Sequence, residues 1–442
     1  MSLSTEQSQR DHIKELSRTH VFTSWSAQGA LDQLPLAGGE GAHFWDHEGN
    51  RYLDLTSQLV NVNIGYQHPK LVAAIQEAAG QLATIAPGFD SESRAEAARL
   101  IAERAPERMN KVFFTNSGAE AVENAIRLAR LHTGRHKLLA AYRSYHGATH
   151  GAISLTGEAR RLGSEPGIPG VVHFWGPYLY RSAFHATTEQ EESERALEHL
   201  RQTVQFEGPD QVAAIILEPV VGSNGILVPP PGYLEGVRAL CDEHGIMLIA
   251  DEVMAGFART GQWFAIQHWD VRPDLITFAK GVNSGYIPLG GVVLSDEISE
   301  TFHERPYPGG LTYSGHALAC ASAVASITIM EEEGILEHVR RLDEEVLRPG
   351  LTALAETHEV VGDVRGLGAF WALELVADRE SREPLGAEAM GRIGAACKAE
   401  GVWPLVMANR VHVVPPCVIT ADEARHALEV LGRALSSVRE AA

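Results

Sequence analysis

Two apolar segments of the chain each lead to a residue that can do chemistry. The segment Leu275–Ala279 is followed by Lys280, and the segment IMLIAD ends on Asp251. A lysine amine can form a Schiff base, and a carboxylate can keep a heteroaromatic nitrogen protonated. Each residue also has an ordinary reading, because a strand-end lysine is often a solvated charge and a strand-end aspartate often caps a helix.

A third segment, Lys111–Arg130, predicts a buried strand, a tight turn and a helix. Val112–Phe114 form the apolar strand, and Asn116, Ser117 and Gly118 are residue types of turns and helix N-caps. The free N–H groups of a helix start bind anions, and glycine allows a close approach. The segment therefore predicts either a phosphate site or an ordinary capped helix.

The order of the segments favours the phosphate site. SGAE is followed by YHG, EPV, DEV and finally FAKG, which contains the lysine. A Schiff-base lysine, a carboxylate for a pyridinium nitrogen and a phosphate site are the three things that pyridoxal phosphate requires of a protein. We therefore predict a pyridoxal 5'-phosphate site.

With these motifs the chain resembles the class III aminotransferases, which are fold type I pyridoxal phosphate enzymes. The resemblance extends from Thr115 to Phe370, with weaker matches toward both ends. It implies an α/β fold, with a mostly parallel central sheet in a large domain and a small α+β domain. The matching motifs are TNSGAEAVENAIRLAR, YRSYHGATHGA, AAIILEPVVGSNGI, LIADEVMAGFARTG, FAKGVNSGYIPLGGVV, LTYSGHALACA and RGLGAF.

The resemblance assigns roles around the cofactor ring. Lys280 would hold the cofactor covalently and then move a proton to and from the substrate, and Asp251 would pair with the pyridinium nitrogen. Val253 would pack on one ring face and Tyr145 would stack on the ring, with His146 beside it. Without the resemblance, Tyr145 could equally be a half-buried core aromatic.

The resemblance also implies a site shared between two subunits. Ser117, Gly118 and Ala119 would bind the phosphate, and Thr312 of a neighbouring subunit would complete that site, so the enzyme would be an obligate homodimer. In relatives, the residue at Glu218 hydrogen-bonds near the active site or masks a switching arginine. From the sequence alone, Thr312 is an ordinary turn residue and Glu218 a helix-start carboxylate.

The substrate carboxylate has no obvious partner. Class III relatives place a carboxylate-binding arginine at one of two positions, which are Leu405 and His412 here. Their loss argues against glutamate and 2-oxoglutarate as the usual co-substrates. Arg410 could replace them, because strand periodicity puts it on the same face as His412, although an exposed strand-end arginine is commoner.

The N-terminal part resembles the taurine–pyruvate and β-alanine–pyruvate aminotransferases. The segment SQLVNVNIGYQHP lines the substrate entrance in ω-aminotransferases, and Val60 stands where an aromatic residue is often found. Phe22 and Trp25 would add to the entrance wall. We expect a ping-pong transfer from an ω-amine such as taurine or β-alanine to pyruvate or a related small keto acid.

Several alternatives remain open. A dialkylglycine-type decarboxylase or an aminomutase of the same fold would keep Lys280 and Asp251, whereas a non-catalytic homologue would be expected to lose one of them. A nicotinamide enzyme is excluded because no GxGxxG follows the first strand. His146 and His150 do not form a metal pair, because glycines interrupt the helix and no HExxH glutamate is present.

Composition excludes several other classes of protein. The chain has 442 residues, of which 45% are hydrophobic and 21% charged, and a net charge of −20, which argues against nucleic acid as a partner. Four scattered cysteines show no CxxC pair, and no run approaches the roughly 18 apolar residues of a membrane span. The polar N-terminus lacks a signal sequence, so we expect a cytoplasmic enzyme without membrane partners.

The length predicts more than one domain. We expect an N-terminal arm with part of the small domain at residues 1–64, a large cofactor-binding domain at 65–330 and a C-terminal small domain at 331–442. Residues 1–40 have no clear period and predict an irregular arm, followed by a hairpin over Gly41–Leu55. Helices are predicted at Ile335–Glu356, near Glu388–Glu400 and at Ala421–Val438.

Overall fold

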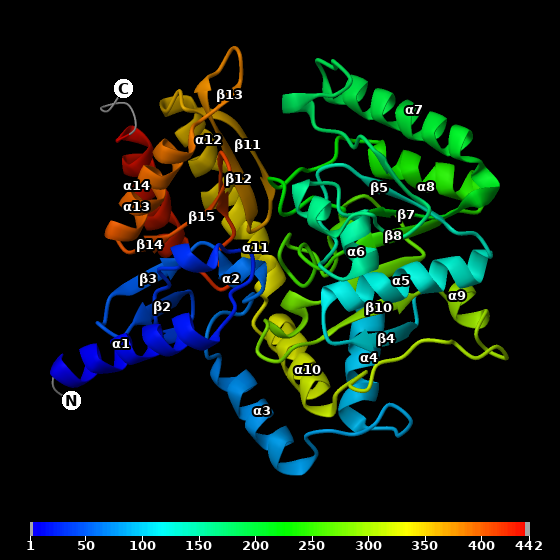
Figure 1. The fold of residues 1–442 in the computed structure, drawn as a ribbon, viewed down its shortest axis with the longest axis horizontal. Helices are drawn as coiled ribbons and strands as arrows, with labels where there is room; N and C mark the ends of the chain where they lie inside the picture. Colours follow the sequence, from blue (N-terminus) through cyan, green and yellow to red (C-terminus); the bar gives the residue numbers. More distant parts are fainter. Residues whose placement is uncertain (1–2, 438–442) are drawn as a thin grey trace.

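A computed structural model describes residues 3–437 and contains three β-sheets (Figure 1). The largest has seven strands in the order β4-β10-β9-β8-β7-β5-β6. Strands β9, β8, β7, β5 and β6 pair in parallel, and β10 is antiparallel to both its neighbours. The strands are β4 (Lys111–Thr115), β5 (Lys137–Ala141), β6 (Val171–Phe174), β7 (Val212–Leu217), β8 (Met247–Asp251), β9 (Leu275–Phe278) and β10 (Gly290–Leu294).

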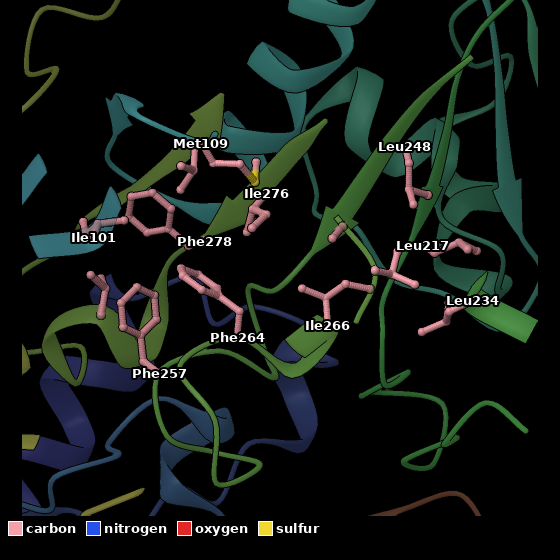
Figure 2. Packing of buried hydrophobic residues seen from close by; sticks show 14 of the residues in the cluster. Ile101, Met109, Leu217, Leu234, Leu248, Phe257, Phe264, Ile266, Ile276 and Phe278 are labelled. Atoms are coloured by element: carbon pink, nitrogen blue, oxygen red, sulfur yellow. The ribbon is translucent and has the colours of Figure 1, made fainter. Parts of the chain in front are cut away.

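Helices cover both faces of this sheet, because its strands are apolar on both sides. In β7, Ile215 and Leu217 face one core cluster, while Ala214 and Ile216 face the other. The first cluster is the larger, and Figure 2 shows Ile276 and Phe278 of β9 packing within it. Its helices are α4 (Glu92–Arg104), α7 (Glu189–Glu207), α8 (Tyr233–His244) and α10 (Ala317–Glu332), and the opposite face carries α5 (Gly118–Thr133), α6 (His150–Leu155) and α9 (Asp296–Glu300).

The irregular arm expected at residues 1–40 is wrong, because α1 occupies Leu3–His20. The segment is rich in glutamate, glutamine, lysine and arginine, which favour helix even without an apolar face. Lys14 pairs with Asp32 at 2.8 Å, so the helix is held by charges rather than by burial. Because the segment is polar, hydrophobic periodicity does not predict this helix.

The predicted N-terminal hairpin is present. It consists of β2 (His43–Asp46) and β3 (Arg51–Asp54), and Asp46 accepts hydrogen bonds in the turn from the N–H groups of Glu48 and Asn50, both at 2.9 Å. β1 (Leu36–Glu40) and the C-terminal strand β14 (Val402–Trp403) complete a four-stranded sheet. The N-terminal segment is therefore joined to the C-terminal part of the chain.

The third sheet carries the C-terminal residues (Figure 1). Its strands are β11 (Val361–Leu367), β12 (Phe370–Asp378), β13 (Glu383–Pro384), β15 (Leu405–Met407) and β16 (Arg410–Val413). Around it lie α11 (Ile335–Leu342), α12 (Arg348–Thr357), α13 (Ala387–Ala399) and α14 (Ala421–Ser436), and α3 (Pro69–Gln81) packs on α10. We propose residues 1–64, 65–330 and 331–442 as the three parts of the domain organisation.

Two details of these helices differ from expectation. The single helix expected at Ile335–Glu356 is divided by a π-helical segment at Asp343–Leu347, which ends two residues before Pro349. That proline has no N–H to continue the regular bonding. The last helix ends at Ser436, and Val438 lies outside the described residues. The helix near Glu388–Glu400 is present as α13.

A left-handed turn, α2 (Ser57–Val60), lies between the hairpin and α3. Its four residues have φ of 45°, 50°, 63° and 60°, a conformation that costs residues with side chains about 1–2 kcal/mol each. The Ser57 hydroxyl donates to the carbonyl of Val414 at 2.6 Å and accepts from Arg259 at 3.1 Å. Contacts from distant parts of the chain therefore hold this turn in place.

Candidate active site

The carboxyl ends of several central strands meet at one edge of the sheet, where open α/β folds bind ligands. Asp251 ends β8, Lys280 follows β9 and Glu218 follows β7. They line a cavity of about 380 Å³. The lining includes nine residues singled out from the sequence, which are Ser117, Gly118, Ala119, Tyr145, His146, Glu218, Asp251, Val253 and Lys280.

Asp251 is buried and fixed by three hydrogen bonds. One carboxylate oxygen accepts from the Thr277 hydroxyl at 3.0 Å and from the N–H of Val253 at 3.1 Å. The other oxygen lies 2.7 Å from Nδ1 of His146. The carboxylate is thus oriented from two sides, so its position is determined before any ligand arrives.

Lys280 occupies an unusual backbone position at the end of β9. Its φ is 48°, in the left-handed region, so the chain turns sharply as it leaves the strand. Burial lowers the pKa of Lys280, and the charge of Arg160 adds to this, while Asp251 and Glu218 act in the opposite direction. The neutral amine, which is the nucleophilic form, is therefore more accessible than in an exposed lysine.

The β4–α5 junction provides an anion cradle. The Ser117 hydroxyl caps the helix by accepting from the N–H of Glu120 at 3.3 Å, and the Glu120 carboxylate accepts from the N–H of Asn116 at 2.8 Å. The next N–H groups belong to Gly118 and Ala119, and the first N–H groups of a helix have no preceding carbonyl to pair with. A β-carbon at Gly118 would lie 2.7 Å from Val253, so only glycine leaves this approach open.

Glu218 connects two walls of the cavity. Its carboxylate accepts from the N–H of Tyr145 at 3.0 Å and from the N–H of Gly222 at 2.8 Å. Burial raises the pKa of Glu218 to about 7, although His146 and these two hydrogen bonds favour its charged form. Glu218 therefore holds the strand-end loop that carries Tyr145 against the loop that follows β7.

Five predicted residues lie away from this lining. Val60 is buried in an apolar cluster with Val220, Phe370 and Val414, because the left-handed turn directs it into the core. Arg410 donates to the carbonyl of Asn224 at 2.6 Å. Phe22 and Trp25 are 87% and 66% exposed, and Thr312 is exposed in the loop before α10. The four residues proposed for substrate are therefore not brought to the cavity by this chain, whereas Thr312 was expected to serve another subunit.

Sequence reasoning missed Arg160. Its guanidinium lies 3.9 Å from the ring centre of Tyr145, and its Nε pairs with Glu158. The residue sits in a short 3-10 segment, Ala159–Ser164, which has no periodic signal and no motif. Arg160 itself is not among the residues that line the cavity, whereas Asn61, Ser223 and Met254 are. An arginine next to the predicted stacking tyrosine could be found only from three-dimensional proximity.

Comparisons with known proteins agree with this geometry. The family model Aminotransferase class-III matches residues 27–435. The chain belongs to the class III aminotransferases. Acetylornithine aminotransferase of Methanopyrus kandleri is 39% identical over 403 residues, covering 91% of this chain and 94% of the relative. Putrescine–pyruvate aminotransferase of Pseudomonas aeruginosa is 36% identical over 423 residues, with 92% of each chain covered.

A solved structure extends the comparison to the fold of this aminotransferase. Taurine:2-oxoglutarate aminotransferase from Bifidobacterium kashiwanohense, in complex with pyridoxal phosphate and glutamate, superposes with a TM-score of 0.94 at 41% identity, covering 98% of each chain. The predicted family, fold class and cofactor are thereby confirmed. Within residues 3–437, no helix combines the length and apolar character needed to cross a membrane.

The residues of this aminotransferase fit pyridoxal phosphate. Ser117, Gly118 and Ala119 would hold the phosphate, and Asp251 would hold the ring nitrogen. Nε2 of His146 is buried and has no partner among the described residues, although its other nitrogen is bound to Asp251. Lys280 would supply the covalent attachment. The donor set and the cradle thus match the charge pattern of the cofactor, with an anion at one end and a cationic ring nitrogen.

Proposed function

We propose that this aminotransferase moves the amino group of a small ω-amine with an anionic far end, such as taurine or β-alanine, to pyruvate or a related small keto acid. The observation that carries the proposal is Arg160, whose guanidinium lies over the ring of the cavity-lining residue Tyr145. Its side chain is 30% exposed, so the guanidinium retains access to solvent. An arginine fork binds carboxylates and sulfonates through paired N–H groups, which favours an anionic donor.

The two positions that bind carboxylate in other relatives support the same choice. Leu405 is apolar, and burial lowers the pKa of His412 to about 3, helped by the charges of Arg410 and Arg365. His412 is therefore neutral at physiological pH and offers no charge to a second carboxylate. A small keto acid with one carboxylate fits these residues better than a dicarboxylic acid.

Different residues of this chain have different roles in the reaction. The bound cofactor supplies an electron sink for the bond that breaks at the substrate carbon. Asp251 would keep the ring nitrogen protonated, and Tyr145 and Val253 would confine the ring. The Nζ amine of Lys280, whose pKa is lowered by burial, accepts the substrate proton and returns it. In the second half of a ping-pong cycle, the same groups act in reverse on the keto acid.

The experiment follows the visible absorption of the purified holoenzyme as taurine, β-alanine, putrescine, L-alanine and L-glutamate are added separately. Bleaching by taurine or β-alanine, reversed by pyruvate, is the expected result. Bleaching only by putrescine or by L-glutamate would overturn the donor proposal. Release of carbon dioxide from the donor would indicate a decarboxylase, and amine migration without a keto acid would indicate an aminomutase.

A matched pair of variants tests the role of Arg160. Arg160→Met should raise the KM for taurine and β-alanine about tenfold or more, because a charged hydrogen-bond partner is lost, while the KM for putrescine stays within about twofold. Arg161→Met is the control, since Arg161 pairs with Glu165 at 3.0 Å, whereas Arg160 lies over the ring of the lining residue Tyr145. Equal effects of Arg160→Met on anionic and cationic donors would contradict the assignment.

A further inference from the structure

The turn that follows Glu218 forms part of the cavity wall and is held from two directions. Within it, the N–H of Gly225 donates to the carbonyl of Gly222 at 3.0 Å, and Val221 and Leu227 pair as a β-bridge at its base. Ser223 of this turn lines the cavity. The carboxylate of Glu218 holds the inner end of the turn through the N–H of Gly222.

Two arginines of the C-terminal sheet hold the outer end of the same turn. Nε of Arg365 donates to the carbonyl of Gly225 at 2.7 Å, and Arg410 donates to the carbonyl of Asn224 at 2.6 Å. The φ of Gly225 is 116°, and a β-carbon there would lie 2.6 Å from Nη2 of Arg365 and 2.8 Å from Cδ of Arg410. The turn and the two arginines are thus in contact without space for another atom.

Glu374 fixes Arg365 in this arrangement. The buried carboxylate accepts from Nη2 of Arg365 at 2.8 Å and also from Arg181 and the Tyr178 hydroxyl. Burial alone would raise the pKa of Glu374, but Arg365, Tyr178 and Arg181 lower it to about 2, so it is ionised throughout the physiological range. Arg365 also donates to Asp363 at 2.6 Å, so all three of its guanidinium nitrogens have protein partners.

We propose that Glu374 and Arg365 are positioning residues, which fix the turn Gly222–Ile226 and thereby the position of Ser223 in the cavity wall. Glu374 and Arg365 come from the C-terminal sheet, whereas Tyr178, Arg181 and the turn belong to the large part of the chain. Their contacts therefore connect the packing of the two parts to the shape of the cavity. The proposal requires an aminotransferase, but not the particular donor proposed above.

A thiol at position 223 reports directly on the turn. The four native cysteines are buried, so a Ser223→Cys holoenzyme gains one thiol at the cavity wall. In that background, Glu374→Gln should raise the rate of labelling by a maleimide about tenfold, the scale of losing a hydrogen bond to a charged group. Gly225→Ala should have a similar effect, because the added β-carbon would displace the Arg365 and Arg410 side chains that hold the turn. Because both changes release the same turn, the double variant should gain little more than either alone.

Kinetics separate positioning from general destabilisation. With β-alanine and pyruvate, Glu374→Gln should raise KM several-fold and leave kcat and cofactor occupancy within about twofold. Glu400→Gln is the matched control, because that exposed carboxylate pairs with Arg433 at 2.6 Å. Unchanged labelling in Gly225→Ala, or additive effects in the double variant, would overturn the proposal. Gly225→Ala alone decides it if Glu374→Gln does not fold, and labelling needs no substrate.

Discussion

At the scale of single residues, we propose that the orientation of Asp251 determines how the cofactor is used. Thr277, Val253 and His146 all bind its carboxylate, so its geometry survives the loss of charge. Asp251→Asn should retain cofactor and fold but lose about 10²-fold or more in kcat, because a neutral amide does not stabilise the protonated ring. Single-turnover kinetics measure the loss of rate, and the absorption spectrum measures the retained cofactor. A rate within tenfold of the parent would contradict this role.

His412 makes stability depend on pH in a defined direction. Its pKa is about 3 in the folded protein, against 6.5 for an ordinary histidine, because burial disfavours the cation. The unfolded chain therefore binds a proton below about pH 6.5 that the folded chain does not, and stability falls as pH decreases, by about 1.4 kcal/mol per pH unit. His412→Leu should flatten this dependence. Urea unfolding of the parent and of His412→Leu between pH 5 and 6.5 tests this prediction. An equal change of the unfolding free energy with pH in the two proteins would refute it.

At the scale of elements, the start of α5 leaves no room for a side chain. A β-carbon at Gly118 would lie 2.7 Å from the branched side chain of Val253, which also lines the cavity. Gly118→Ala should weaken cofactor binding about tenfold while the apoprotein remains folded, since the cradle shifts by a few tenths of an ångström. Equilibrium dialysis gives the cofactor Kd. Gly134→Ala, at the left-handed C-cap of the same helix, is the control that should cost stability without changing this Kd.

The elements that carry the site were predictable because their signals are local. An apolar run that ends in a reactive side chain, such as the run before Lys280, predicts both a strand and the position of its carboxyl end. Arg160 was missed, and Arg410, predicted as a possible carboxylate ligand, donates instead to the carbonyl of Asn224, since the reach of a long side chain depends on how separate segments pack. Helix α1 was missed because charge, rather than periodicity, supports it. Local sequence patterns thus predicted the residues for the cofactor, whereas the residues that contact substrate depend on tertiary contacts.

At the scale of the whole molecule, we propose a homodimer with shared sites. Thr312 is exposed and lies outside the cavity lining of its own chain, and its neighbour Tyr313 is 58% exposed. Phe89 and Leu82 add exposed apolar surface at 63% and 46%. Large exposed apolar side chains of this kind are typical of a surface that another protein covers. A second copy of the chain is the partner that would also complete the phosphate site.

Mixing two inactive variants tests whether the site is shared. If Thr312 serves the partner's site, a hybrid of Lys280→Ala and Thr312→Val subunits contains one intact site, so an equal mixture should regain about a quarter of parental activity. If Thr312 serves its own chain, no hybrid site is intact. Activity after denaturation and joint refolding gives the answer, and the separately refolded variants provide the baseline.

The left-handed turn at Ser57–Val60 also bears on how the protein folds during its synthesis. Four such residues cost about 4–8 kcal/mol in total, which is comparable to the net stability of a domain. The offsetting bonds come from the Val414 carbonyl and from Arg259, which also binds the carbonyl of Pro415. A segment synthesised among the first residues therefore reaches its final shape only after nearly the whole chain has left the ribosome. During synthesis, the fragment that precedes residue 414 lacks the carbonyl to which the Ser57 hydroxyl donates.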